Sequence, residues 1–435
     1  MVSRCRHCST TENSQAIDKG SNQYAYNAGL DENSLDLAGN PRFSGNSIDI
    51  GAYEYQETGP ILETPSIIVT TLDDVVDAYD GQISLREAIF YANAGDTITF
   101  AENLSGGTIT LNGEQLAITK DLIITTANLE NGITIDANQK SRVFSIVGCD
   151  VTLVGLTITG GNATNGGGIY MKNAVLSLMD SEVIGNKSTG AAHSTSGGGG
   201  IYSDGGSLMI NQTLIANNTS TSYGAGIYLV NSKTSIEDST INGNASTTSA
   251  GGLFVYKSLL RMDGNVMISS NTAVKDGAGL FMMGANSVAF ITGATFEGNR
   301  LSGGLAVRGA GIFMDSGRMF LSGVAFTGNI SSGYGAGIYQ LGGELTVADN
   351  TRFENNTSTS PLITKGNNIH SMSVNAKTHV SETTWLDDHL ATFLDYTGST
   401  GSIAKVGSNV TTDETDAAML LFLDELKNLD LNFFG

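Results

Sequence analysis

The feature that most constrains this chain is a pair of short signatures, each of which occurs seven times between residues 168 and 356. The first is glycine followed by an aliphatic and then an aromatic residue, beginning at Gly168-Ile169, Gly200-Ile201, Gly226-Ile227, Gly252-Leu253, Gly279-Leu280, Gly311-Ile312 and Gly337-Ile338. The second is an apolar residue three positions before an asparagine, at Val183 and Asn186, Leu214 and Asn217, Ile241 and Asn244, Ile268 and Asn271, Phe296 and Asn299, Phe326 and Asn329, and Phe353 and Asn356. Successive asparagines of this series lie 27 to 31 residues apart, which predicts an array of similar structural units.

Short runs of alternating apolar and polar residues lie between the signatures, such as VLSLMD at 175–180 and SLMINQ at 207–212. Such runs predict strands with every second side chain directed inward. Three short strands within about 27 residues suit one coil of a parallel β-helix better than a propeller blade, which needs about 40 residues. The sequence therefore predicts an all-β solenoid whose coils pair with their neighbours.

Two columns of turn residues are expected in these coils. The residues three positions before the apolar anchor are Asp180, Asn211, Asp238, Asn265, Gly293, Gly323 and Asn350. Asp, Asn and Gly share a tolerance of left-handed backbone, so this column predicts a corner. The asparagines that end the second signature predict another column of the same kind, in which stacked amides hydrogen-bond along the axis.

These signatures carry a resemblance to known families. From Gly155 to Asn368 the GGxI and FxxN patterns resemble the repeats of chlamydial-type polymorphic outer membrane proteins, and a GNNI motif ends at Ile369. Upstream, DGQISLREAIFYANAGDTITF (80–100) and VTLVGLTITGGNA (151–163) resemble the opening of bacterial β-helix proteins of the CSLREA type. Ile83 stands where that motif has cysteine, which excludes a thiol role here. The resemblance implies a right-handed parallel β-helix of the pectin-lyase-like fold.

A short helix is expected to cap the N-terminal end of the solenoid within residues 61–150, because a solenoid must cover its open ends. Ser84 and Glu87 have capping-box spacing, and Leu85, Ala88, Ile89 and Ala92 form one apolar face. Gly95 is a plausible stop for this helix. Arg86 and Glu87 are adjacent and ionisable, but we favour the cap over an acid/base pair.

The remaining segments predict a division of the chain into four parts. Residues 1–60 contain QAIDKGSN, DLAGNPRF and IDIGAYEYQ, which resemble the closing segment of a preceding β-helix module of the choice-of-anchor type. A closing segment ahead of an opening one (61–150) indicates a piece of a longer protein or a misplaced start. Residues 151–370 form the repeats. Residues 371–435 form a C-terminal cap or tail, in which 412–434 read as an acidic amphipathic helix with Leu420, Leu423, Leu426 and Leu429 on a related face.

Composition bears on location and partners. A balance of 22 basic and 43 acidic residues gives a net charge of −21, which repels phosphate backbones and excludes nucleic acid as the expected partner. No stretch has the length of a membrane helix, and the start lacks the apolar core of a signal peptide. The glycine-rich composition nevertheless suggests an extracellular or bacterial outer-surface protein.

Cys5, Cys8 and Cys149 are too few for a disulfide framework, and Cys5 and Cys8 form only half of a zinc site.

Catalytic patterns are weak in this sequence. A lyase site would need clustered carboxylates for calcium with a basic residue nearby, and a glycoside hydrolase would need paired acids. Asp180 and Asp238 share a column, but Asn211 lies between them in that column. We therefore expect no cofactor and assign no metal ligands, with calcium left open. One irregularity is a pair of longer loops, after Asn186 and after Asn299, the second of which contains Arg300 and Arg308 as candidate ligand contacts.

Three functions remain open from the sequence. The first is a non-catalytic rod of a secreted or cell-surface protein that acts in adhesion or display, with a glycan or surface protein as partner. The second is a polysaccharide lyase or hydrolase. The third is a glycan-binding module without catalysis, favoured if the aromatic residues of the first signature form an exposed row, since sugars stack on flat rings. These residues are Tyr170, Tyr202, Tyr228, Phe254, Phe281, Phe313 and Tyr339.

Overall fold

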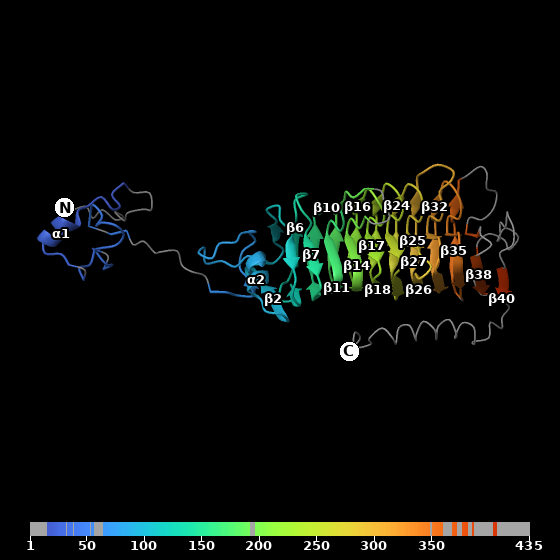
Figure 1. Cartoon of the computed structure of the whole chain (residues 1–435), viewed down its shortest axis with the longest axis horizontal. Helices are drawn as coiled ribbons and strands as arrows, with labels where there is room; N and C mark the ends of the chain where they lie inside the picture. Colours follow the sequence, from blue (N-terminus) through green and yellow to red (C-terminus); the bar gives the residue numbers. More distant parts are fainter. Residues whose placement is uncertain are drawn as a thin grey trace. The chain divides into compact units, whose positions relative to one another are not determined.

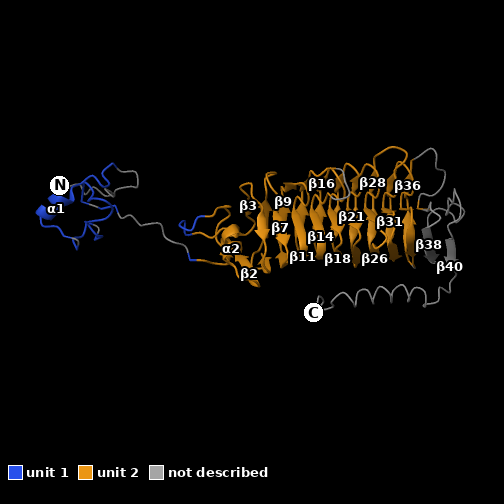
Figure 2. Cartoon of the chain, in the orientation of Figure 1, with its two compact units in different colours: residues 1–64, 77–81 blue, residues 65–76, 82–435 orange. Residues whose placement is uncertain are grey.

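The computed structural model describes residues 15–359 except 32, 38, 53, 56–63, 192–195 and 349, together with 368–371, 376–381, 385–386 and 403–406. Two compact units are present, one of residues 1–64 with 77–81 and one of 65–76 with 82–435 (Figure 2). The predicted helix at 412–434 lies outside the described residues. No helix in the described part of the chain has the length and apolarity needed to cross a bilayer.

The smaller unit contains one short helix, α1 (Asn22–Asn27), and a buried ion pair. The Arg42 guanidinium lies 2.8 Å from the Glu54 carboxylate. Burial raises the pKa of Glu54, while hydrogen bonds from the Asp49 and Ser44 backbone and the charge of Arg42 oppose the shift. The proposal that residues 1–60 close a preceding β-helix stays a prediction.

The larger unit is a right-handed parallel β-helix, as the sequence predicted. Its described strands form three sheets (Figure 1). The eleven-stranded sheet contains β3 (Thr108–Thr110), β6 (Ile133–Asp136), β9 (Leu156–Thr159), β12 (Glu182–Ile184), β15 (Leu214–Ala216), β19 (Thr240–Asn242), β23 (Met267–Ser269), β27 (Thr295–Glu297), β31 (Ala325–Thr327), β35 (Arg352–Glu354) and β39 (Trp385–Leu386). The eight-stranded sheet contains β10 (Asn162–Ala163), β13 (Lys187–Ser188), β16 (Thr219–Ser220), β20 (Ala245–Ser246), β24 (Thr272–Ala273), β28 (Arg300–Leu301), β32 (Ile330–Ser331) and β36 (Thr357–Ser358).

The third sheet has twenty-one described strands because most coils contribute two consecutive strands to it. They are β1 (Ile68–Val69), β2 (Asp96–Phe100), β4 (Leu116–Ile118), β5 (Leu122–Thr125), β7 (Phe144–Val147), β8 (Asp150–Val154), β11 (Ile169–Met179), β14 (Ile201–Asn211), β17 (Ile227–Val230), β18 (Lys233–Glu237), β21 (Leu253–Tyr256), β22 (Leu259–Asp263), β25 (Leu280–Met283), β26 (Val288–Thr292), β29 (Ile312–Met314), β30 (Arg318–Ser322), β33 (Ile338–Gln340), β34 (Gly343–Val347), β37 (Ile369–Ser371), β38 (Ala376–Ser381) and β40 (Ile403–Val406). A coil such as that of β17 to β20 therefore has four strands on three sheets, where the sequence predicted three strands. The extra strand arises because a short turn at Asn231 and Ser232 divides the long strand that β11 and β14 keep continuous.

The N-terminal cap contains α2 (Leu85–Tyr91) and is followed by a short 3-10 helix, η1 (Glu102–Leu104). Both halves of the capping box are present: the Glu87 amide donates to Ser84 Oγ, and the Ser84 amide donates to Glu87 Oε2. The apolar face of α2 is buried, as its spacing predicted. The helix ends at Tyr91 with Ala92 as C-cap, so the predicted stop at Gly95 lies four residues beyond the actual end.

The aliphatic residue of the first signature points into the core of the solenoid in every coil. Neighbouring coils pair in register at these positions, which are Ile169, Ile201, Ile227, Leu253, Leu280, Ile312 and Ile338, all 0% exposed. The glycine before each of them lies against the backbone of the next coil. A Cβ on Gly226 would meet the Gly252 carbonyl oxygen at 2.7 Å and the Asn244 amide at 3.1 Å. The signature needs glycine because these coils stack too closely for a side chain.

The second signature forms a buried amide ladder along the axis. Each asparagine Nδ2 donates to Oδ1 of the asparagine in the next coil, at 2.9 to 3.1 Å, through the series Asn186, Asn218, Asn244, Asn271, Asn299, Asn329 and Asn356. The predicted member Asn217 is wrong, because Asn218 occupies the ladder and Ile215, not Leu214, is the inward anchor of that coil. Asn217 is exposed with a φ of 55°.

The left-handed backbone also differs from the prediction. It lies one residue before each ladder asparagine, at Gly185, Asn217, Gly243, Ser270, Gly298, Gly328 and Asn355, so the ladder asparagines are not themselves the corner. The other predicted corner has left-handed residues at Asp180, Gln212, Asp238, Gly264, Gly293, Gly323 and Asn350. Two of its seven members, Asn211 and Asn265, were thus misplaced by one residue.

Candidate functional site

The aromatic residues of the first signature do not form an exposed row. They point away from the main core, but from Tyr202 to Tyr339 they are at most 7% exposed and pack into a second apolar cluster. Tyr223 and Tyr334, from the connections that precede the signature, contribute to this cluster; the Tyr223 ring centroid lies 4.9 Å from that of Phe254. His370 extends the column, stacking on Tyr339 at 5.1 Å. The glycan-stacking argument based on an exposed row is therefore wrong for this column.

The candidate arginines of the longer loop have separate environments. Arg308 binds Asp276 of the preceding coil through Nε to Oδ1 at 2.9 Å, and its Cζ lies 4.6 Å from the centre of the Phe313 ring. Burial lowers the pKa of Arg308, but the hydrogen bond and charge of Asp276 outweigh it and raise the pKa overall. Arg300 is exposed on β28. Arg308 thus has a structural role in the stack, and Arg300 stays the more accessible candidate.

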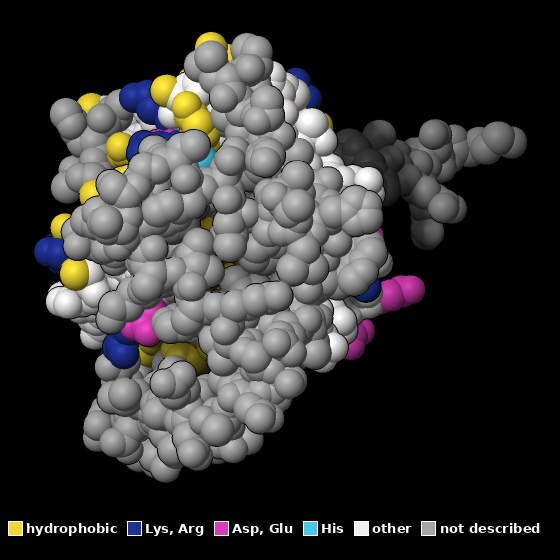
Figure 3. Space-filling model, turned by 90° about the vertical axis from the view of Figure 1, so that its right-hand side faces the viewer, with side chains coloured by type: hydrophobic (Ala, Val, Ile, Leu, Met, Phe, Trp, Pro, Cys, Tyr) yellow, Lys and Arg dark blue, Asp and Glu magenta, His cyan; other side chains and the backbone are white. Residues whose placement is uncertain are grey.

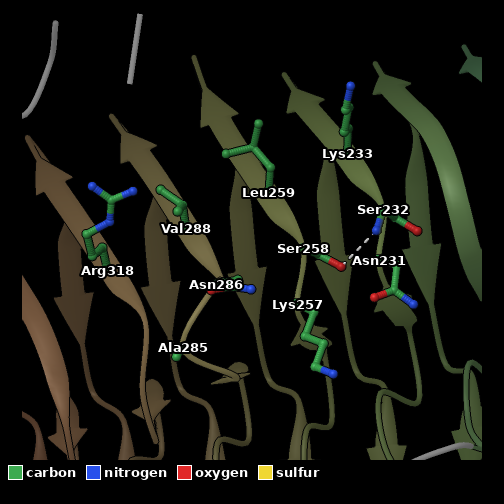
Figure 4. Close-up of a pocket in the computed structure, with 10 residues that line it drawn as sticks. All are labelled: Asn231, Ser232, Lys233, Lys257, Ser258, Leu259, Ala285, Asn286, Val288 and Arg318. Atoms are coloured by element: carbon green, nitrogen blue, oxygen red, sulfur yellow. Dashed lines mark hydrogen bonds between the residues drawn. The ribbon is translucent and has the colours of Figure 1, made fainter. Parts of the chain in front are cut away.

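A shallow hollow on the outward side of the twenty-one-stranded sheet is the better candidate site. Its volume is about 430 Å³, and it lies where β17, β21, β25 and β29 turn into β18, β22, β26 and β30 (Figure 4). The residues that line it are Asn231, Ser232, Lys233, Lys257, Ser258, Leu259, Ala285, Asn286, Val288 and Arg318. We call it the basic hollow, because it combines three cations with no carboxylate on a chain of net charge −21.

The strand register spaces the cations of the basic hollow. Lys233, Leu259, Val288 and Arg318 are direct partners on four successive strands, so two apolar residues separate the outer cations (Figure 4). Three strand steps of about 4.8 Å place Lys233 and Arg318 roughly 14 Å apart along the axis. At the base, the Ser232 amide donates to Ser258 Oγ at 3.0 Å. The floor is thus fixed by buried hydroxyls, while the long cationic side chains are exposed.

A pair of carboxylates lies farther along the same strands. Glu237 and Asp263 are direct partners on β18 and β22, and Arg261 binds Asp263 at 2.6 Å. A hydrogen bond from Thr292 Oγ1 lowers the pKa of Asp263, and the hydrogen bond from Arg261 adds to this, although burial opposes it. A carboxylate held ionised suits binding of a cation or acceptance of a proton better than donation of one.

Sequence reasoning missed both the basic hollow and this carboxylate pair. Each acid directly precedes a left-handed corner residue, Asp238 or Gly264, which would have been a usable signal.

Among the described residues, no group of three or more His, Cys, Asp or Glu side chains is placed to hold a metal ion. Cys149 is buried as expected, and burial raises its thiol pKa. Figure 3 shows lysine and arginine side chains of the described residues scattered around the rim of the solenoid.

Comparisons with known proteins give little further guidance. No protein-family model and no curated protein sequence matches the chain. Among solved structures it is similar to the crystal structure of pectate lyase Pel9A, with 13% identity and a TM-score of 0.41 over 80% of this chain and 81% of that one. At these values the two chains share a distant structural likeness and no more.

Proposed function

We propose that this chain is a non-catalytic β-helix protein of the bacterial surface or of the secreted fraction, which acts as a rigid rod in adhesion or display. The observation that carries the proposal is the amide ladder, which joins seven successive coils without a gap from Asn186 to Asn356. Each ladder amide is buried and bonded to its neighbours, so adjacent coils are held in one register. A stack of this kind favours a stiff scaffold that presents its outward strands.

The sequence resemblance supports the same proposal. The GGxI and FxxN patterns resemble the repeats of chlamydial-type polymorphic outer membrane proteins, which implies placement at an outer surface. The acidic balance of the chain also suits an exposed protein, since net charge of one sign favours solubility. The partner we propose is a glycan or a surface protein of a host or of the environment.

A binding and cleavage assay tests this proposal. The full chain is incubated with neutral and uronic polysaccharides, with and without calcium, and new reducing ends and unsaturated products are measured. The same protein, immobilised on beads, is tested for retention of the beads on glycan-coated and cell-coated surfaces. We expect retention without products. Appearance of products would overturn the non-catalytic assignment and direct attention to Glu237 and Asp263, and absence of retention on every surface would overturn adhesion.

The basic hollow favours a second candidate function, non-catalytic binding of an acidic glycan. Lys233 and Arg318 lie about three strand steps apart, with Lys257 between their coils, so the cations follow the solenoid axis. An extended chain of uronate residues also carries a carboxylate at regular intervals. Asn231 and Asn286 add amides that can bind sugar hydroxyls.

Charge reversal in the basic hollow separates this candidate from the first. We expect Lys233→Glu with Lys257→Glu to weaken retention of uronic polysaccharides at least tenfold and to leave neutral ones unchanged. Lys187→Glu with Arg300→Glu is the matched control, because it also reverses two exposed positive charges but does so on the eight-stranded sheet. Equal losses in both proteins would mean that net charge alone is responsible. Loss only with the control pair would instead point to the two longer loops, which begin at these residues.

A further inference from the structure

One position of the twenty-one-stranded sheet has left-handed backbone in six successive coils. In five of these coils the residue is glycine or asparagine, with φ between 47° and 98°, at Gly148, Asn173, Gly205, Asn231 and Gly284. Lys257 occupies the position in the remaining coil, with a φ of 49°. The strand register fixes this alignment, because Tyr256 pairs with Val230 before the position and Leu259 pairs with Lys233 after it. Lysine is thus the exception in its column.

Lysine is an unfavourable residue for this backbone. Left-handed backbone brings Cβ close to the following carbonyl oxygen; glycine has no Cβ, and the short polar side chain of asparagine can hydrogen-bond locally. Lysine has neither property, so Lys257 lowers the stability of its coil relative to the residues of the neighbouring coils. The Lys257 ammonium lies 5.0 Å from the centre of the Tyr256 ring, but an exposed cation–π contact offsets little of this cost. The outlier therefore indicates a function for the side chain.

Lys257 is one of the cations of the basic hollow. Its side chain is exposed, and no carboxylate in the described part of the chain forms an ion pair with it. Figure 4 shows the Lys257 side chain reaching to one side of the serines of the floor, and those of Lys233 and Arg318 reaching to the other side. A ligand that lies along the hollow therefore meets positive charge on both of its sides.

A linear polyuronate has the matching chemistry. Its successive sugars are rotated relative to one another, so its carboxylates point to different sides of the chain. A lysine ammonium is a compact point charge on a flexible stem, which suits a carboxylate whose position varies along a polymer. A neutral ester of the same polymer offers the same hydroxyls to the amides of the hollow but no charge to its cations.

We propose that Lys257 is the specificity-determining residue of the basic hollow, and that it binds a carboxylate on the side of the glycan opposite to the side that faces Lys233 and Arg318. This inference rests on the proposed binding of an acidic glycan, and it adds which residue distinguishes a charged chain from its neutral counterpart. The chain tolerates an unfavourable backbone at this one coil because binding needs a cation there.

Substitutions of Lys257 in the full chain test the proposal, with polygalacturonate and its neutral methyl ester as probes. We expect Lys257→Asn to weaken retention of polygalacturonate at least fivefold, to leave retention of the ester unchanged, and to raise the midpoint of thermal unfolding by about 1 to 3 °C. Lys257→Arg keeps both the charge and the unfavourable backbone, so it should keep retention within about twofold and leave the midpoint unchanged.

Two matched controls carry the same change from lysine to asparagine at residues without left-handed backbone. Lys233→Asn, within the hollow, should weaken retention of polygalacturonate without raising the midpoint. Lys187→Asn, on the exposed side of the eight-stranded sheet, should alter neither quantity. Lys257→Asn combined with Lys233→Asn should weaken retention by the product of the two single losses, because the two lysines contact different carboxylates of one chain.

The contrary results each overturn a stated part of the argument. A lower midpoint in Lys257→Asn, or an equal rise in Lys187→Asn, would overturn the cost of lysine at this position and with it the inference. A combined loss no greater than the single losses would show that the glycan does not contact both sides. Retention by the wild type that survives Lys257→Asn would overturn the inference alone, whereas a wild type that retains neither probe would overturn the binding of an acidic glycan as well.

Discussion

Replacement of Asn218 by alanine removes one amide from the middle of the ladder. Its Nδ2 donates to the Val183 carbonyl at 2.8 Å and to Asn244 Oδ1 at 3.0 Å. Its Oδ1 accepts from the Asn186 amide nitrogen at 2.9 Å and from Asn186 Nδ2 at 3.1 Å. Alanine eliminates these four hydrogen bonds and leaves a buried backbone N–H of Asn186 without its acceptor.

The expected cost follows from the number of bonds and their burial. A hydrogen bond contributes about 1 kcal/mol net, and a buried unsatisfied donor costs about 1 to 3 kcal/mol. We therefore expect Asn218→Ala to lower the free energy of unfolding by about 3 to 6 kcal/mol. The neighbouring Asn217 is exposed and has left-handed backbone, so Asn217→Gly should change stability by no more than about 0.5 kcal/mol.

Guanidinium denaturation followed by far-ultraviolet circular dichroism measures both variants. The pair is informative, because the two positions are adjacent asparagines in one coil and only Asn218 places its side chain in the ladder. A loss below about 1 kcal/mol for Asn218→Ala would refute the energetic role of the ladder. A larger loss for Asn217→Gly than for Asn218→Ala would refute the register of this coil.

Three further predictions concern other parts of the solenoid. Burial raises the pKa of Tyr202 to about 12. The neutral phenol of Tyr202 should therefore contribute stability that is intact below pH 10 and is lost as the pH rises toward 12. Tyr202→Phe should reduce the slope of the free energy of unfolding against pH in that window, as measured by thermal unfolding. Ser84→Ala removes a buried cap and should cost about 1 to 2 kcal/mol, with Ser84→Thr, which keeps the hydroxyl, as the comparison; equal losses would exclude the capping bond as the cause. A double-mutant cycle with Arg308→Ala and Asp276→Ala should give a coupling energy of about 1 to 3 kcal/mol, and additive effects would contradict a stabilising ion pair.

The inward face and the cap could be predicted because their signals are local. Alternation places Ile227 in the core from its own strand, and Ser84 and Glu87 meet within one helical turn. The register of one coil could not be predicted, because Leu214 with Asn217 and Ile215 with Asn218 have the same spacing. Only the stacking of the asparagine on those of the adjacent coils decides between the two registers. This stacking is a contact between residues about 30 positions apart, so a local pattern cannot reveal it.

The candidate site could not be predicted from the sequence, because it depends on contacts between residues of different coils, which lie far apart along the chain. Each aromatic residue follows an inward aliphatic residue, so alternation directs it outward, as the structure shows. The burial of this column arises from residues such as Tyr223 that cross over it from another coil. The partnership of Glu237 and Asp263 was hidden by an extra residue in the turn after Asp263, which shifts the following strand by one position. A repeat alignment that follows only one signature cannot detect a shift of a single residue between the strands of one coil.

The amide ladder also sets a unit of length for the molecule. Every ladder asparagine bonds only to its nearest neighbours in the stack, so removal of one whole coil, such as the residues from Ile227 to Gly252, brings Asn218 opposite Asn271 with the same partners available. Insertion or loss of part of a coil instead interrupts the ladder and misaligns the glycines beside it. The chain can therefore lengthen or shorten in evolution by whole coils, in steps of about 4.8 Å, with its outward strands kept in phase.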